Sequence, residues 1–134
     1  MYPNIQLYID GTWGPAAAGE TLPVPNPATG EVLGTVAHAR PADLDRALLA
    51  AQRGFAIWKN TSALERTKVL RKAAALLRER SEPIARLMTL EQGKTLNESR
   101  QEVERGAEAT DWMAGEIQRI YGRTIPARAG IVRP

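Results

Sequence analysis

Residues 62–121 alternate apolar and polar side chains at the spacing of amphipathic helices. Charged residues occupy the positions between the apolar ones, so each segment presents one apolar face and one polar face. The pattern predicts three successive helices, separated by breaks near residues 81 and 93. The apolar positions that carry this prediction are Val69, Leu70, Ala73, Ala74, Leu76 and Leu77, then Ile84, Leu87, Met88 and Leu90, then Val103, Ala107, Ala114 and Ile117.

Capping and turn residues mark the ends of these helices. Ser62–Glu65 and Thr95–Glu98 have the spacing of capping boxes, in which a hydroxyl and a carboxylate each satisfy a free backbone N–H. Pro83 fits only the first turn of a helix. Gly93 suits a left-handed C-terminal cap, and Gly122 is the expected stop of the last helix.

The first forty residues predict strands instead. Ile5–Ile9 alternates, Asp10–Gly11 is a strong two-residue hairpin turn, and a return strand begins at Thr12. Two prolines restrict Leu22–Pro25 to an edge strand, and Glu31–Val36 is the strand that runs back. We therefore expect residues 1–40 to form a small antiparallel β-meander.

A further helix is expected between the meander and residue 62. Pro41 and Asp43 suit its first turn. Its expected buried face consists of Leu44, Ala47, Leu48, Ala51, Phe55 and Trp58. The apolar faces of four helices exceed what a small meander covers, so the pattern predicts an α/β fold that is incomplete as given and belongs to a larger domain.

Composition narrows the class of protein without defining a function. The 134 residues suffice for one domain, and 18 basic and 15 acidic side chains alternate along the helices. The net charge of +3 therefore indicates solvated helix faces and not a nucleic-acid surface. The absence of cysteine excludes a disulfide, a thiolate nucleophile or a cysteine metal site within these residues. No secretion signal or membrane-spanning run is evident, so we expect a soluble, cytoplasmic protein.

No residue of the chain is a convincing catalyst. Gly93-Lys94-Thr95 resembles the end of a phosphate-binding loop, but Met88 stands where that loop needs glycine, and a helix precedes it instead of a strand. His38 is the only histidine and has no partner for a metal site. The carboxylates Glu98, Glu102, Asp111 and Glu116 lie on a helix beside Arg100, Arg105 and Arg119, as solvent-exposed pairs would. We assign no catalytic, cofactor-binding or metal residue.

Four sequence blocks resemble the N-terminal part of the NAD(P)-dependent aldehyde dehydrogenases, in the order and spacing of that family. The blocks are Tyr8-Ile-Asp-Gly-Thr-Trp13, Asn26-Pro-Ala-Thr-Gly-Glu31, Glu65-Arg66 ahead of Leu76-Leu-Arg-Glu-Arg80, and Thr89-Leu-Glu-Gln-Gly-Lys94. The ending Arg119-Ile-Tyr-Gly-Arg-Thr-Ile-Pro126 is similar to the branch that oxidises semialdehydes of dicarboxylic acids. Succinate semialdehyde and 2-oxoglutarate semialdehyde are the substrates that this resemblance implies.

The resemblance also implies a place for each part of the chain. Residues 1–40 and 41–122 would form the outer layer of the cofactor-binding domain, and residues 123–134 would begin the arm that joins subunits into dimers or tetramers. The complete enzyme would bind NAD or NADP. In some members a monovalent cation lies between positions that correspond to the Pro25 carbonyl and the Glu91 carboxylate.

The family's chemistry uses a cysteine thiolate, a glutamate that activates water and an asparagine that helps to hold the oxyanion. All three, and the dinucleotide loop, are expected beyond Pro134. The chain alone is therefore expected to bind cofactor poorly and to catalyse nothing. A different class remains open, namely a non-catalytic remnant or interaction module that pairs through an unfinished sheet edge.

Overall fold

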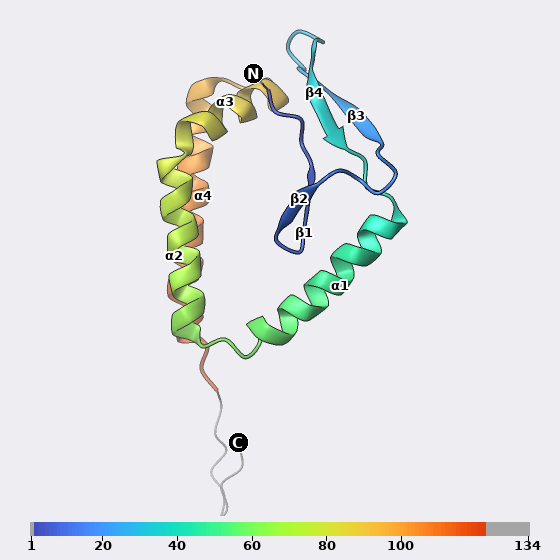
Figure 1. Cartoon of the computed structure of the whole chain (residues 1–134). Helices are drawn as coiled ribbons and strands as arrows, with labels where there is room; N and C mark the ends of the chain where they lie inside the picture. Colours follow the sequence, from blue (N-terminus) through green and yellow to red (C-terminus); the bar gives the residue numbers. More distant parts are fainter. Residues whose placement is uncertain (1, 123–134) are drawn as a thin grey trace, which may run out of the picture.

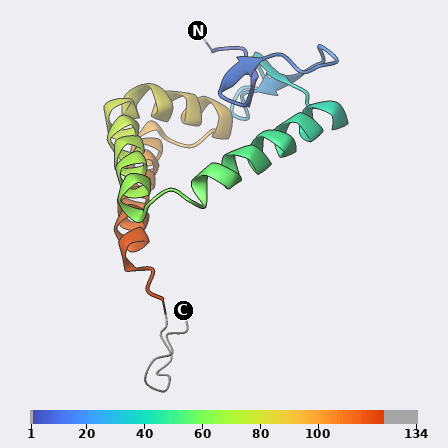
Figure 2. The same cartoon turned by 60° about the horizontal axis from the view of Figure 1, so that its bottom comes forward.

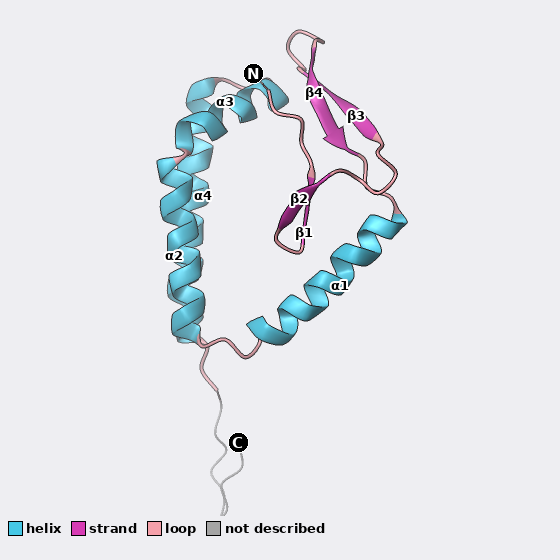
Figure 3. Ribbon diagram, viewed as in Figure 1, coloured by secondary structure: helices cyan, strands magenta, loops and turns pink. Residues whose placement is uncertain are grey.

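Strands occupy the first third of the molecule and helices the remainder (Figures 1 and 3). The structure, a computed structural model, describes residues 2–122. The expected arm at residues 123–134 lies outside the described residues. The elements are β1 (Leu7–Ile9), β2 (Thr12–Gly14), β3 (Thr21–Pro25), β4 (Val32–Ala37), α1 (Pro41–Trp58), α2 (Ala63–Glu79), α3 (Ser81–Gln92), α4 (Leu96–Glu116) and the short 3₁₀ helix η1 (Ile117–Arg119).

The strands form two separate antiparallel hairpins, β1–β2 and β3–β4. The first turns through Asp10 at φ 55° and Gly11 at φ 78°, which confirms the predicted two-residue turn. A single parallel bridge, Ile5 to Val36, connects the N-terminal segment to the second hairpin. The strands are antiparallel as expected, but they form two hairpins and not one meander. β3 cannot serve as a central strand because Pro23 and Pro25 lack the N–H groups that a second neighbour would need.

The core lies where α2, α3 and α4 meet. α2 and α4 run side by side in opposite directions, and α3 connects them at one end (Figure 2). The fully buried side chains at this junction are small, which lets the helix backbones approach closely. Ala74, Ala85, Val103, Ala107 and Ala114 are its buried apolar residues.

Buried hydroxyls tie the same helices together. The Thr67 hydroxyl of α2 donates to the Ala114 carbonyl of α4 at 3.0 Å, and the hydroxyls of Thr89 and Ser99 are 2.9 Å apart between α3 and α4. Thr67 and Ser99 are 2% and 0% exposed, so these bonds satisfy polar atoms that water does not reach. Both hydroxyls therefore fix the relative position of the helices as well as filling space.

The predicted buried face of α1 is wrong for the part of the chain that the structure describes. Leu44, Leu48 and Phe55 are 55%, 68% and 64% exposed. The helix instead directs its polar side to the first hairpin, where the Arg53 guanidinium pairs with the Asp10 carboxylate at 2.8 Å. No other described element covers the apolar stripe, which leaves it free to pack against another surface.

Most helix ends follow the predicted capping residues. Thr95 and Glu98 form a complete capping box, and Gly93 is left-handed at φ 73°. Ser62 forms only half of one, because the Glu65 carboxylate pairs with Lys68 at 2.7 Å instead. The last α-helix is also shorter than predicted, since its end tightens into η1 well before residue 122.

Replacing Ala107 by Leu should destabilise the protein by about 1–3 kcal/mol, because three extra carbons cannot fit between the closely packed helices. Ala107 is fully buried, whereas Ala109 lies exposed on the same helix. Ala109→Leu is therefore the matched control and should change the free energy of unfolding little. Chemical denaturation of both variants tests this, and equal effects would contradict the proposed core.

Candidate functional site

The joint between α3 and α4 contains the Gly-Lys-Thr sequence that resembles part of a phosphate loop. The Gly93 N–H donates to the Thr89 carbonyl at 2.9 Å and closes α3. The Thr95 hydroxyl then accepts the Glu98 N–H at 3.3 Å, and the Glu98 carboxylate accepts the Thr95 N–H at 3.1 Å. Gly93 and Thr95 thus act as helix caps, as the sequence predicted, and the helices themselves use the N–H groups of these two residues.

The Asn-Pro turn between β3 and β4 packs against this joint. The Asn26 side chain accepts the Ala28 N–H at 2.9 Å, and Gly30 closes the turn at φ 77°. A Cβ added at Gly93 would lie 3.1 Å from the Pro27 ring. Two of the family-like sequence blocks, which are remote in the chain, therefore meet in space, and glycine is needed at their contact.

The expected cation ligands each lie two residues before a member of this contact, Pro25 before Pro27 and Glu91 before Gly93. Pro25 is the last residue of β3, and Glu91 lies in the last turn of α3, where its carboxylate accepts a hydrogen bond from the Tyr2 hydroxyl. Among residues 2–122 there is no cluster of three or more histidine or acidic side chains that could hold a metal. A site built from one carbonyl and one carboxylate stays a prediction.

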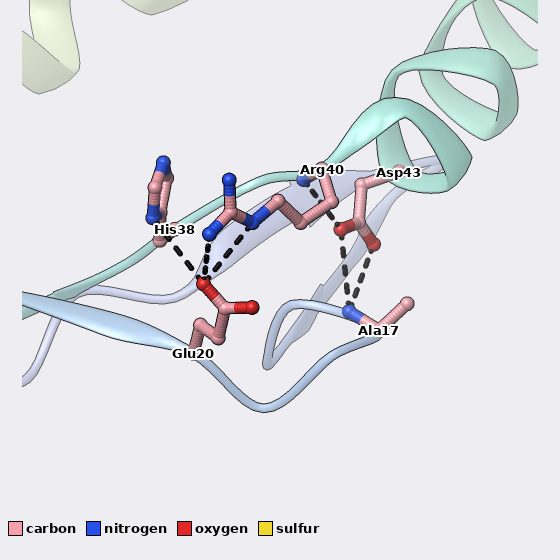
Figure 4. A network of polar contacts seen from close by, with 5 residues as sticks. All are labelled: Ala17, Glu20, His38, Arg40 and Asp43. Atoms are coloured by element: carbon pink, nitrogen blue, oxygen red, sulfur yellow. Dashed lines mark hydrogen bonds and ion pairs between the residues drawn. The ribbon is translucent and has the colours of Figure 1, made fainter.

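A polar network joins the loop before β3 to the start of α1 (Figure 4). The Asp43 carboxylate, only 1% exposed, accepts the Ala17 N–H at 3.0 Å and the Arg40 N–H at 3.1 Å. The Glu20 carboxylate accepts the Arg40 guanidinium, with His38 3.6 Å away. His38 thus lies beside an ion pair near the surface, and nothing in this arrangement presents it as a catalytic base.

Hydrogen bonding keeps both carboxylates of this network ionised. The Arg40 N–H lowers the pKa of Asp43, burial opposes that shift, and the Ala17 N–H and the Arg46 guanidinium 3.4 Å away support it. The Arg40 guanidinium likewise lowers the pKa of Glu20. Their charges hold the loop and the helix together, and neither carboxyl has the raised pKa that a proton donor near neutral pH needs.

The remaining candidate carboxylates are paired on the helix surfaces. Glu102 pairs with Lys94, Glu116 with Arg119 at 2.8 Å, and Asp111 with Arg78 at 2.7 Å. Glu98 serves the capping box. These contacts account for each acid without invoking chemistry, although Glu102 and Asp111 pair with Lys94 and with Arg78 of α2 and not with the neighbours expected from the sequence.

Two contacts of this region could not be foreseen from sequence spacing. Tyr2 reaches Glu91 across 89 positions, and Asp43 reaches Ala17 across 26. The position of Asp43 in the first turn of α1 predicted that it would cap this helix. No pattern of neighbouring residues indicated that it also binds the loop at Ala17. Long-range polar partners emerge only when the elements are packed.

Comparison with known proteins assigns the chain to a family. The profile of the aldehyde dehydrogenase family matches residues 13–133. A 3-sulfolactaldehyde dehydrogenase of Pseudomonas putida is 46% identical over 121 residues, which are 90% of this chain and 25% of that protein. A glutarate-semialdehyde dehydrogenase of Pseudomonas putida shows the same identity over the same lengths and shares, 46% over 121 residues, 90% and 25%.

A solved structure supports the same assignment. PnpE in complex with nicotinamide adenine dinucleotide superposes with a TM-score of 0.91 at 37% identity, over 97% of this chain and 27% of that one. The chain therefore belongs to the aldehyde dehydrogenase family, as its sequence blocks indicated, and adopts part of the α/β cofactor-binding domain. It spans about a quarter of the length of the curated relatives that it matches.

A helix that crosses a lipid bilayer must be both long and apolar. Within residues 2–122, no helix combines the length and the apolar character that a membrane span requires.

Replacing Gly93 by Ala should destabilise the protein by about 1–2 kcal/mol, since its left-handed backbone disfavours a side chain and Pro27 crowds the new methyl group. At Gly106 in α4, φ is not positive and a methyl group added there would meet no atom within 4 Å. Gly106→Ala should therefore stabilise the helix by roughly 0.5–1 kcal/mol. Thermal unfolding of both variants tests this prediction. Changes of the same sign in the two unfolding midpoints would contradict the role of Gly93 as a left-handed helix cap.

Replacing Asp43 by Asn should lower the thermal unfolding midpoint, because the substitution removes the negative charge and its NH₂ group cannot accept the hydrogen bonds that the replaced carboxylate oxygen accepted. The pKa of Asp43 is lower in the folded protein than in the unfolded chain, where it is about 4. The ionised carboxylate therefore stabilises the fold fully above about pH 4, and this stabilisation is lost as the pH falls through the pKa of the folded state. Asp43→Asn should therefore flatten the decline of stability in acid. The exposed Asp45, exchanged for Asn, is the control, and an equal flattening there would contradict the role of Asp43.

Proposed function

We propose that this chain is a segment of an NAD(P)-dependent dehydrogenase that oxidises an aldehyde carrying a second, anionic group. The names of its relatives support this. Glutarate semialdehyde bears a carboxylate, and 3-sulfolactaldehyde bears a sulfonate, at the end away from the aldehyde. Succinate semialdehyde and 2-oxoglutarate semialdehyde also carry a carboxylate at the end away from the aldehyde. The substrate class is therefore a small aldehyde whose far end is negative.

The proposed reaction consumes the aldehyde, NAD(P)⁺ and water, and yields the carboxylic acid, NAD(P)H and a proton. The cofactor accepts the hydride from the aldehyde carbon. The 134 residues contain no cysteine to form the covalent bond with that carbon. We accordingly assign to this chain a structural share of the cofactor-binding domain and no catalytic step, and expect the chain by itself to be inactive.

The apolar stripe of α1 supports that structural share. Leu44, Leu48 and Phe55 form one exposed face at helical spacing, which is the surface that an α/β domain lays against its sheet. We propose that a parallel sheet of the complete domain covers it. The stripe would then be an internal surface of the enzyme.

We further propose that the complete enzyme is a cytoplasmic homo-oligomer, a dimer or a tetramer. Light scattering on the purified enzyme tests the assembly, and a monomer at working concentration would overturn it. Cell fractionation tests the location, and recovery with the membrane fraction would contradict it.

The complete enzyme should prefer glutarate semialdehyde over pentanal, a neutral aldehyde of the same chain length, by roughly 10–100-fold in kcat/KM. A buried cationic side chain of the complete enzyme, paired with the carboxylate of the substrate, would supply this preference. Steady-state rates of NAD(P)H formation measure it at constant ionic strength. Equal values of kcat/KM for the two aldehydes would contradict the proposed preference for an anionic substrate, but would not contradict aldehyde oxidation itself.

The alternative function, a stand-alone interaction module, is separated from this proposal by the intact mass of the protein from its source cells. A dehydrogenase should have a mass several-fold above 14.7 kDa and carry a cysteine and a dinucleotide loop in the added sequence. A mass of 14.7 kDa would contradict the enzyme and favour the module.

A further inference from the structure

Residues 2–5 form an N-terminal strap along β4. The Ile5 N–H donates to the Thr35 carbonyl at 2.8 Å, and the Ile5 carbonyl accepts the Ala37 N–H at 2.8 Å. The Asn4 side-chain oxygen accepts the Thr35 N–H at 3.3 Å and the Thr35 hydroxyl at 3.2 Å. The strap is thus held on the edge of β4 that β3 leaves open.

Tyr2 extends the strap from the hairpin to a helix. Its ring lies so close over Gly34 of β4 that a Cβ added there would be 2.7 Å from the Tyr2 Cδ1 atom. Its hydroxyl donates to the Glu91 carboxylate in the last turn of α3. One half-buried side chain therefore touches both the β3–β4 hairpin and the C-terminal end of α3.

Little else holds this hairpin against α3. A groove of about 910 Å³ lies between them, with Val32 and Leu33 on one side and Leu87 and Leu90 on the other. Tyr2 and Pro3 also line it. Beyond the groove, the Pro27 ring meets Gly93. The position of the hairpin thus depends on a small number of contacts, of which the Tyr2 hydrogen bond is the only side-chain bond between the strap and α3 in residues 2–122.

We propose that the N-terminal strap fastens the β3–β4 hairpin to the end of α3, with Tyr2 as the positioning residue. Loss of the bond between Tyr2 and Glu91 releases the hairpin and loosens the last turn of α3. The joint that carries Gly93 then opens more often, while the buried contacts of α2 with α4 stay intact. This device is separate from the proposed enzymatic function, because it concerns only contacts within the chain.

The chemistry of the hydrogen bond between the Tyr2 hydroxyl and the Glu91 carboxylate favours a contact that persists. A hydroxyl donating to an ionised carboxylate makes one of the stronger hydrogen bonds of proteins. Burial of the ring, the hydrogen bond and the charge of Glu91 raise the pKa of Tyr2 to about 12. The raised value means that the hydroxyl stabilises the fold fully below its ordinary pKa of about 10, and that this contribution is lost as pH rises through about 12.

Tyr2→Phe tests the hydroxyl in the purified protein, since it keeps the ring over Gly34. Amide hydrogen exchange in the last turn of α3 and in β4 should become about tenfold faster, and exchange in the middle of α4 should not change. Tyr8→Phe is the matched control, because the Tyr8 ring packs on Trp13, with centroids 4.9 Å apart, within the first hairpin. Unchanged exchange near Glu91 in Tyr2→Phe would overturn the proposal.

A double-mutant cycle tests the ring independently. Gly34→Ala should accelerate the same exchange, because the new methyl group displaces Tyr2. In a Tyr2→Ala background the same change should add little, since the ring that it would displace is absent. Full additivity of the two substitutions would show that Tyr2 does not lie on Gly34, and would overturn the proposal even if single variants are unstable.

Discussion

The close approach of α2 and α4 is the constraint on which the rest of the described structure depends. Alanines at positions 74, 107 and 114 are fully buried, so the two backbones are separated by little more than methyl groups. The Thr67 hydroxyl can reach the Ala114 carbonyl only because of that proximity. α3 packs on α4 beside this pair, and the end of α3 in turn receives the strap and the Asn-Pro turn.

The sequence predicted what depends on local chemistry. Gly93 and Thr95 were identifiable as caps because their roles involve residues three or four positions away. Asp10 and Gly11 likewise predicted a turn from two residues. The family resemblance rested on such blocks, and the match over residues 13–133 confirmed it.

Contacts between distant elements were beyond the same reasoning. The antiparallel strands and the edge position of β3 were predicted, but the sequence did not show that the strands divide into two separate hairpins. The stripe from Leu44 to Phe55 was correctly recognised as apolar but is exposed here, since periodicity reports which face is apolar and not what covers it. The candidate site was limited in the same way, because neither Asp43 nor Tyr2 has its decisive partner nearby in sequence.

The apolar stripe of α1 ends at Trp58, whose indole is 40% exposed and lies under the Arg66 guanidinium, 5.6 Å from the ring. Trp13 and Trp112 are 63% and 66% exposed. Indole emission shifts to shorter wavelength when water is excluded. Because Trp58 sits at the end of that stripe, covering of α1 would move its share of the indole emission to shorter wavelength without any added label.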